Sequence, residues 1–444
     1  MKASWTTLGR GPGFKVVLIV GIVGVLTLGL GLQNDVVRER QSSRDEAVSR
    51  TVDEWGGEQK FAGPFLKVPY REFVAKGQQQ EVRRGFAYLL PQDFRAFTEL
   101  STETRTRGIY EVPLYRANVS VTGAFALPES AAWFPRGAEV DWAGAELWVF
   151  VGKAGGLDAK PVLTFDGHTL TPVRAPFDTD LGLEALSAPV DLGAVGVVAK
   201  FDIQMALKGG ASFGVLPAGA DSVISLTSDH GQPTFGGSFL PSKRSLGTDG
   251  FQAEWRIPAL ARSLPSRGTV DTWKDVLSSG IPFASAGLGV AFDAYRLLDR
   301  ALKYGLLFII VPFIALFLYE LFLKRRLHPI QYFLVGLAVL MFYLLVLTLS
   351  EHVPFDGAFA IGALAVCLLL GVYGVPVLGG RGAGVGFAAG MAVLYGLLLL
   401  IIRSEDNALL VGTLFLFVLL TVVMVSTRGV DWYRLGRSEV ESQE

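Results

Sequence analysis

Residues 304–323 read YGLLFIIVPFIALFLYELFL, and Glu320 is the one charged side chain among them. A helix needs about 20 apolar residues to cross the hydrocarbon core of a bilayer, so this run predicts a membrane span. Five further apolar runs of similar length occur at about 14–32, 330–350, 357–378, 383–402 and 408–426. The sequence therefore predicts six transmembrane helices, five of them close together in the last third of the chain.

The first apolar run has a second interpretation, a cleaved signal peptide, because Lys2, Arg10 and Lys15 precede or open it. The run is longer than the usual apolar region of a signal peptide, so we favour a span. We predict an α+β membrane protein in which a large β-rich extracytoplasmic domain is inserted between helix 1 and helix 2. The predicted parts are a cytoplasmic N-terminus with the first span (1–32), a juxtamembrane helix (33–56), a β-rich periplasmic domain (57–303), spans two to six (304–426) and a cytoplasmic tail (427–444).

The orientation rests on the short loops, because Lys and Arg are enriched on the cytoplasmic side of a membrane. Residues 324–326, between spans two and three, read KRR, and Arg381 lies between spans four and five. The loops on the opposite side, 351–356 and 403–407, contain most of the nearby acidic residues. This distribution predicts both termini on the cytoplasmic side of the membrane and the large domain on the outer side; the resemblance described below implies that this membrane is a bacterial inner membrane and the outer side its periplasm.

Period-two alternation supports the β-rich domain. Between Val197 and Leu207, apolar residues occupy every second position and polar residues occupy several of the others, as in a strand with one buried face. Other expected strands are 82–90, 109–125 with a break at Pro113, 146–151, 162–165, 223–227 and 251–257. Many short strands suggest an antiparallel sandwich or a related β-rich fold. Val48, Val52 and Trp55 form an apolar stripe on the preceding helix.

Composition excludes several classes of function. The net charge of −1 gives no reason to expect nucleic acid as a partner. The single cysteine, Cys367, lies in an apolar run, so the large domain contains no disulfide. Four histidines without zinc-site spacing lead us to expect no metal and no cofactor. No nucleophile elbow or metalloprotease motif is present.

Polar residues gather at the predicted periplasmic ends of the spans, and this cluster consists of Glu351, His352, Asp356, Glu405 and Asp406. Carboxylates and an imidazole at a membrane surface could bind a metal or act as acid and base. We favour the structural interpretation, in which they mark loop ends and cap helices. Asp406 or Asn407 is the candidate cap for span six.

Three glycines, Gly382, Gly386 and Gly390, are spaced four residues apart. On a helix they form one smooth face, so we expect them to pack closely against another helix. Two smaller expectations concern the cytoplasmic side. Glu320 should pair with Lys324 one turn later, and the dipeptide His328-Pro329 should begin span three.

Several segments resemble the CreD family of bacterial inner-membrane proteins. They are RLHPIQYFLVGL (326–337), LSEH (349–352), ALLVGT (408–413), DWY (431–433), FLPSKR (239–244) and GFQAEW (250–255). The resemblance spans nearly the whole chain. It implies a role in cell-envelope integrity, a link to a two-component regulatory system, and resistance to envelope stress and β-lactams. It implies no catalytic residues.

Two functions are therefore considered. The first is a non-enzymatic protein whose periplasmic domain binds an envelope protein or cell-wall component while the spans anchor it in the lipid bilayer. The second is a membrane enzyme or transporter that uses the polar cluster. The second requires the cluster to converge in one cavity.

Overall fold

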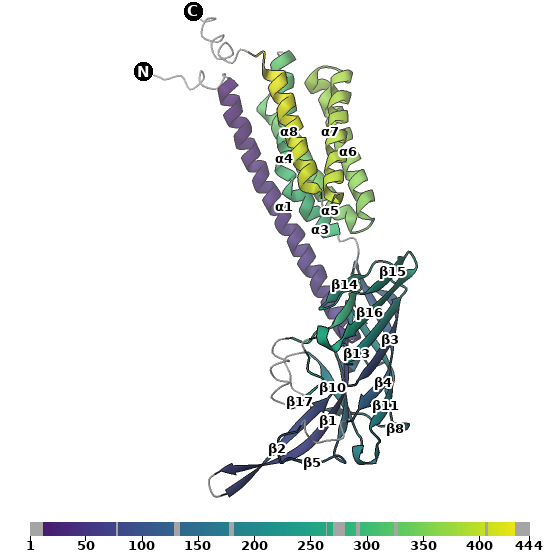
Figure 1. The fold of residues 1–444 in the computed structure, drawn as a ribbon. Coiled ribbons are helices and arrows are strands. Elements are labelled where there is room, and N and C mark those ends of the chain that lie inside the picture. Colours follow the sequence, from purple (N-terminus) through teal and green to yellow (C-terminus); the bar gives the residue numbers. More distant parts are fainter. Residues whose placement is uncertain are drawn as a thin grey trace, which may run out of the picture. The chain divides into compact units, whose positions relative to one another are not determined.

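A computed structural model describes residues 12–76, 79–127, 134–176, 182–262, 264–269, 280–289, 294–323, 327–404 and 407–430. The chain divides into two compact units, one formed by Met1–Arg44 with Phe292–Glu444 and the other by Asp45–Ala291. The first unit contains the apolar helices and the second contains all the described strands, most of which are labelled in Figure 1.

Six helices of the described chain are long and apolar enough to span a membrane. They are α1 (Pro12–Trp55), α4 (Gly305–Leu323), α5 (Pro329–Ser350), α6 (Phe355–Leu378), α7 (Arg381–Arg403) and α8 (Ala408–Thr427). The bounds of α4 to α8 confirm five predicted spans to within a few residues, and α1 contains the sixth, 14–32, but continues to Trp55. A short amphipathic helix, α3 (Ala294–Lys303), precedes α4 and buries Tyr295, Leu298 and Leu302.

Helix α1 is one uninterrupted helix of 44 residues. At 1.5 Å per residue it is about 66 Å long, roughly twice the thickness of the hydrocarbon core. The predicted juxtamembrane helix is therefore the continuation of the first span. Its stripe packs as expected, because Val52 is buried with Val112 and Leu114 of the β domain while Trp55 covers them.

The β unit contains two sheets, one of ten and one of eight strands. The longest strands are β1 (Gln59–Lys76), β2 (Gln79–Leu89), β3 (Asp93–Arg107), β4 (Tyr110–Ala126) and β11 (Val198–Gly210). The other strands are β5 (Glu139–Val140), β6 (Glu146–Val151), β7 (Val162–Phe165), β8 (His168–Leu170), β9 (Val173–Ala175), β10 (Glu184–Pro189), β12 (Ser212–Val215), β13 (Asp221–Ser228), β14 (Thr234–Gly237), β15 (Lys243–Gly247), β16 (Gly250–Pro258), β17 (Arg267–Thr269) and β18 (Ala284–Gly287).

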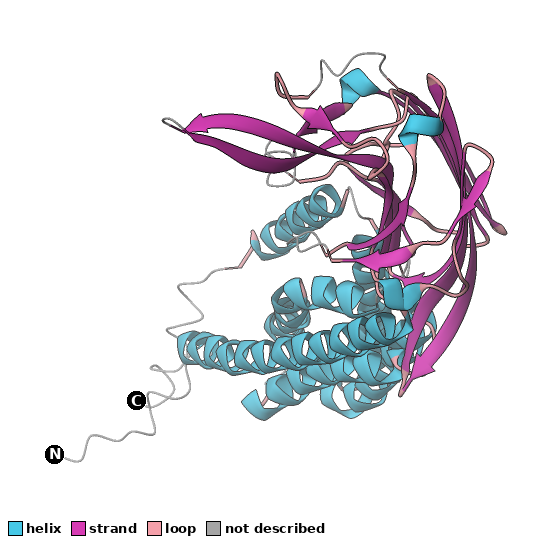
Figure 2. Ribbon diagram, turned by 90° about the horizontal axis from the view of Figure 1, so that it is seen from below, coloured by secondary structure: helices cyan, strands magenta, loops and turns pink. Residues whose placement is uncertain are grey.

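The eight-stranded sheet has the order β15-β16-β13-β3-β4-β11-β7-β8. Its strands alternate buried and exposed residues, and the buried face joins one apolar core with the ten-stranded sheet. Figure 2 shows how these strands, in magenta, form broad twisted sheets. Sheets packed face to face confirm the β-rich prediction.

Two features differ from the sequence-based expectation. Strand β4 does not break at Pro113, because β11 pairs with β4 only from Leu114 onward and leaves Pro113 beside one neighbour. Proline is tolerated where its nitrogen needs no partner. The sheets are also not purely antiparallel, since β1 pairs with β12, and β3 with β13, in parallel.

Candidate functional site

Two carboxylates of the predicted polar cluster, Glu351 and Asp356, bind residues of other helices. Tyr295 Oη donates a hydrogen bond to Glu351 Oε1 at 3.4 Å, and Arg40 Nη1 lies 3.9 Å from the same oxygen. Glu351 therefore links α3 and α1 to the end of α5. Asp356, at the start of α6, pairs instead with Arg403 at the end of α7.

The remaining members of the cluster are His352, Glu405 and Asp406. His352 Nδ1 lies 3.2 Å from the Thr348 carbonyl oxygen of its own helix. Glu405 and Asp406 lie outside the described residues. Among the residues that are described, no three His, Cys, Asp or Glu side chains form a group that could hold a metal ion. The described contacts thus assign Glu351 and Asp356 to helix-end pairs.

Three smaller predictions have mixed outcomes. The Asn407 side chain makes no capping hydrogen bond to α8, and the other candidate cap, Asp406, lies outside the described residues. His328 does cap α5, with Pro329 in the first helical position. The predicted partner of Glu320, Lys324, also lies outside the described residues. Within them, Glu320 is bound by Lys15 and by the Tyr332 hydroxyl.

The predicted glycine packing face is wrong, because the close helix contact lies at Gly384, two residues from Gly382 and from Gly386. A Cβ atom on Gly382, Gly386 or Gly390 would meet no heavy atom within 4 Å. A Cβ on Gly384 would lie 2.7 Å from Val375 Cγ2 and 2.8 Å from the Gly371 carbonyl oxygen. Helices α6 and α7 therefore approach at Gly384. Gly386 and Gly390 line an apolar cavity of about 420 Å³ beside α4.

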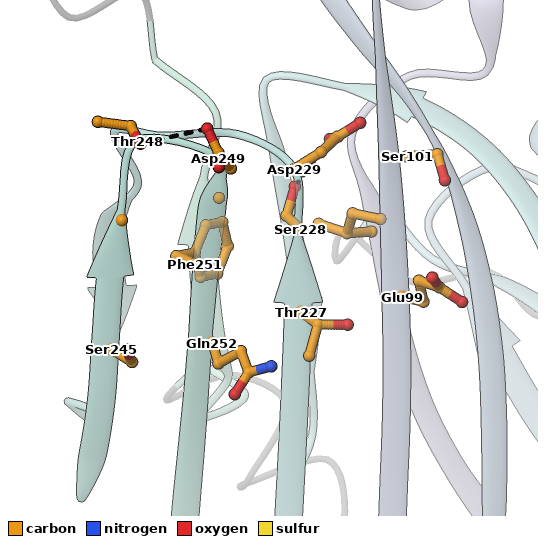
Figure 3. A pocket seen from close by; sticks show the side chains of 13 residues that line it. Glu99, Ser101, Thr227, Ser228, Asp229, Ser245, Thr248, Asp249, Phe251 and Gln252 are labelled. Carbon is orange, nitrogen blue, oxygen red and sulfur yellow. Dashed lines mark hydrogen bonds between the residues drawn. The ribbon is translucent and has the colours of Figure 1, made fainter.

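A larger hollow lies in the β unit, at the end of the eight-stranded sheet (Figure 3). Its volume is about 660 Å³. Strand β13 ends at Ser228, whereas β3 continues beside it and the β15–β16 hairpin continues on the other side. The lining residues are Glu99, Leu100, Ser101, Thr227, Ser228, Asp229, Ser245, Gly247, Thr248, Asp249, Gly250, Phe251 and Gln252.

Strand register aligns the polar side chains of this first hollow. Thr227 is the neighbour of Glu99 on β3 and of Gln252 on β16, and Gln252 is the neighbour of Ser245 on β15. Alternation places all four on the exposed face. They form one polar row across four strands, about 4.8 Å apart.

Hydrogen bonds fix the closed end of this hollow. Asp229 accepts hydrogen bonds from the Thr102 backbone N–H at 2.9 Å and from Thr102 Oγ1 at 2.8 Å. Thr248 Oγ1 donates to Asp249 Oδ1 at 3.2 Å in the hairpin turn. The hydrogen bonds of Asp229 hold the segment that follows β13 against β3. The hollow beyond Ser228 is therefore fixed by contacts within the sheet.

A second hollow of about 430 Å³ adjoins the first and shares Thr227, Ser245 and Gln252 with it. The next row of exposed residues lines it, and this row consists of Lys243, Glu254, Ser225 and Phe97 in neighbouring strands. Arg244 also contributes. Together the two hollows form a continuous depression, which we name the polar groove.

The two hollows differ in charge. Glu99, Asp229 and Asp249 give the first hollow carboxylates, and it is lined by no lysine or arginine. The second contains Lys243 and Arg244, and its Phe97 side chain is 49% exposed. Such a surface can bind hydroxyl or amide groups at one end and an anion at the other.

Sequence reasoning did not identify this groove. Strand β3 was not among the expected strands, although its burial alternates strictly from Asp93 to Leu100. The sequence hides this alternation, because apolar Phe97 is exposed and polar Thr98 is buried. The register that puts Glu99 and Gln252 on either side of Thr227 depends on a parallel pairing that no local pattern encodes.

The fold defines a polytopic membrane protein with a two-sheet β domain between its first and second spans. A family model described as inner membrane protein CreD matches residues 12–433. The chain therefore belongs to the CreD family and is an inner-membrane protein.

Among individual relatives, inner membrane protein CreD of Escherichia coli is 29% identical over 439 residues, which cover 97% of this chain and 96% of the relative. Two solved structures of an M1 zinc metallopeptidase from Deinococcus radiodurans are 9% identical. Each match covers 45% of this chain and 42% of the other, with TM-scores of 0.21 and 0.22. At these scores the likeness carries no argument about fold or activity.

Proposed function

We propose that this protein maintains the integrity of the cell envelope without catalysing a reaction. In this proposal the β domain faces the periplasm and binds an envelope component in the polar groove, and the six spans anchor it. The observation that carries the proposal is the groove itself. It has about 660 Å³ in its first hollow alone, a size that suits a specific ligand, and a lining of hydroxyl, amide and carboxylate groups.

The orientation is tested with reporter fusions to the full chain. A phosphatase joined after Glu444 should be inactive, because the enzyme folds only in the periplasm, whereas a fusion at Ser238 should be active. The sequence supports this arrangement through the KRR cluster at 324–326 between two spans. An active phosphatase after Glu444 would reverse the orientation and remove the periplasmic role.

The binding role is tested in cells that lack the native gene and carry the full-length chain. Changing Glu99 to Ala together with Gln252 to Ala should increase sensitivity to detergent and β-lactam while the protein level remains normal. Gln204→Ala is the matched control, because Gln204 is exposed on β11 of the same sheet and does not line the groove. Full resistance of the double variant at normal abundance would refute the role of the groove.

A further inference from the structure

The chemistry of the polar groove limits its ligand. A lipid tail is disfavoured because the first hollow is lined mainly by polar groups, and a phosphate-rich ligand is disfavoured because its charges are carboxylates. The row Ser245, Gln252, Thr227 and Glu99 offers hydroxyl, amide and carboxylate groups on successive strands. Repeated donors and acceptors of this kind suit a chain of sugar units with several hydroxyls each.

Phe97 is an exposed aromatic residue that lines the second hollow. Its neighbours on the same sheet face are Ser225 on β13 and Ser120 on β4, so an isolated aromatic ring stands on a polar face. The Phe97 side chain is 49% exposed, so one face of its ring is open to a ligand. The electron-rich face of an aromatic ring attracts polarised C–H groups, which the apolar face of a sugar ring presents.

Lys243 and Arg244 are the positively charged residues that line the groove. The nearest carboxylate in register with Lys243 is Glu254, which accepts a hydrogen bond from Arg256 Nε at 2.6 Å. Among the residues that the structure describes, neither Lys243 nor Arg244 has an ion-pair partner within 4.0 Å. These two cations line the second hollow at its β15 end, three strands from Phe97. They can bind a carboxylate, and Arg does so through two parallel hydrogen bonds.

We propose that the polar groove binds a saccharide chain that carries carboxylate groups. The first hollow takes sugar hydroxyls, Phe97 stacks on a sugar ring, and Lys243 and Arg244 hold a carboxylate of the chain. This inference rests on the proposed function, since it names the class of component that the groove binds. A cationic peptide is the competing ligand, because Glu99, Asp229 and Asp249 would attract it.

The test is co-sedimentation of the full-length, detergent-solubilised protein with purified cell-wall sacculi, with chitin and with polylysine-coated beads. Sacculi contain sugar chains with carboxylates, chitin contains similar sugars without them, and polylysine stands for a cationic peptide. We expect binding to sacculi, weaker binding to chitin and no binding to polylysine. Preferred binding to polylysine, or equal binding to chitin and sacculi, would overturn the inference.

Variants locate the contacts. Phe97→Ala should reduce sacculus binding about tenfold, and Phe97→Tyr should keep it because the ring remains. Lys243→Glu with Arg244→Glu should remove the preference for sacculi over chitin. Phe73→Ala is the matched control, because Phe73 is 43% exposed on β1, outside the groove. Unchanged thermal stability of each variant excludes misfolding as the cause.

The outcomes separate this inference from the proposed function. If sacculi are not bound but the Glu99 and Gln252 changes still sensitise cells at normal protein level, the groove keeps its envelope role and the saccharide assignment fails. If sacculi are bound equally well by wild type and by Phe97→Ala, the assignment of the contact surface fails.

Discussion

Lys15 of α1 donates a hydrogen bond to the Glu320 carboxylate of α4, across 305 residues of sequence. Lys15 also donates to the Leu327 carbonyl oxygen at 3.2 Å, and the Tyr332 hydroxyl of α5 donates to the other Glu320 oxygen at 3.1 Å. One carboxylate thus joins three helices. A charge in a membrane helix is costly without partners, so this contact holds the first span against α4 and α5.

Lys15→Met should lower the melting temperature of the purified protein in detergent, because it leaves the partly buried Glu320 carboxylate without its cation. We expect a loss of about 2 kcal/mol. Adding Glu320→Gln should recover part of that loss, since the double change leaves no unpaired charge. A double variant whose loss equals the sum of the two single losses would show that the pair is not coupled.

Gly384→Leu should destabilise the membrane unit by more than 2 kcal/mol, because any Cβ at this position collides with the backbone of α6. Gly386→Ala is the matched control on the same helix, where a Cβ meets open space. Thermal unfolding of both variants in one detergent makes the comparison. Equal midpoints would contradict the close approach of α6 and α7 at Gly384.

Glu351→Gln should cost more stability than His352→Ala, although the two residues are adjacent. Glu351 is contacted by Tyr295 and faces Arg40, whereas the side-chain hydrogen bond of His352 within the described part of the chain is to its own helix. We expect about 1 kcal/mol for Glu351→Gln and less for His352→Ala, with membrane insertion and envelope resistance retained. Loss of resistance in both variants at normal abundance would favour the enzyme or transporter alternative.

The spans and several strands could be predicted from the sequence, but the contacts between distant residues could not. The spans could be predicted because a helix of about twenty apolar residues is long enough to cross the hydrocarbon core. Strand β11 could be predicted because its apolar and polar residues alternate strictly. The glycine face was wrong because spacing of four residues identifies a smooth face but not whether a helix lies against it. Gly384 differs from Gly386 only through its position opposite Val375. The contact of Glu320 with Lys15 could not be predicted because local spacing says nothing about a residue 305 positions away.

A fragment of residues 45–291 should be more stable than one of residues 57–291. The shorter fragment lacks Val52 and Trp55, which cover Val112 and Leu114 of β4. Exposing these side chains should cost about 3 kcal/mol. Urea unfolding of both fragments, followed by circular dichroism, measures the difference. Identical midpoints would mean that the end of α1 contributes nothing to the β domain.

Alkaline pH should weaken the β domain through Tyr88. Burial, with a smaller contribution from Glu146, raises the pKa of Tyr88 to about 12. The folded domain therefore holds this proton more tightly than the unfolded chain, and the resulting stability is complete below pH 10 and is lost as the pH rises to 12. Tyr88→Phe should reduce the fall in the free energy of unfolding between pH 9 and 12. An unchanged slope would refute the assignment to Tyr88.

The parallel pair of β1 with β12 has a consequence for how the protein is made. Strand β1 begins at Gln59, but β12 lies at Ser212–Val215 and is itself covered by β18 at Ala284–Gly287. The ten-stranded sheet can close only after almost the whole domain has been synthesised and moved to its final side of the membrane. Until then the edge of β1 remains open to wrong pairing, because contacts between distant segments form slowly. Biogenesis should therefore depend on holding the nascent domain extended, and truncations before Ala284 should be degraded rather than accumulate as folded intermediates.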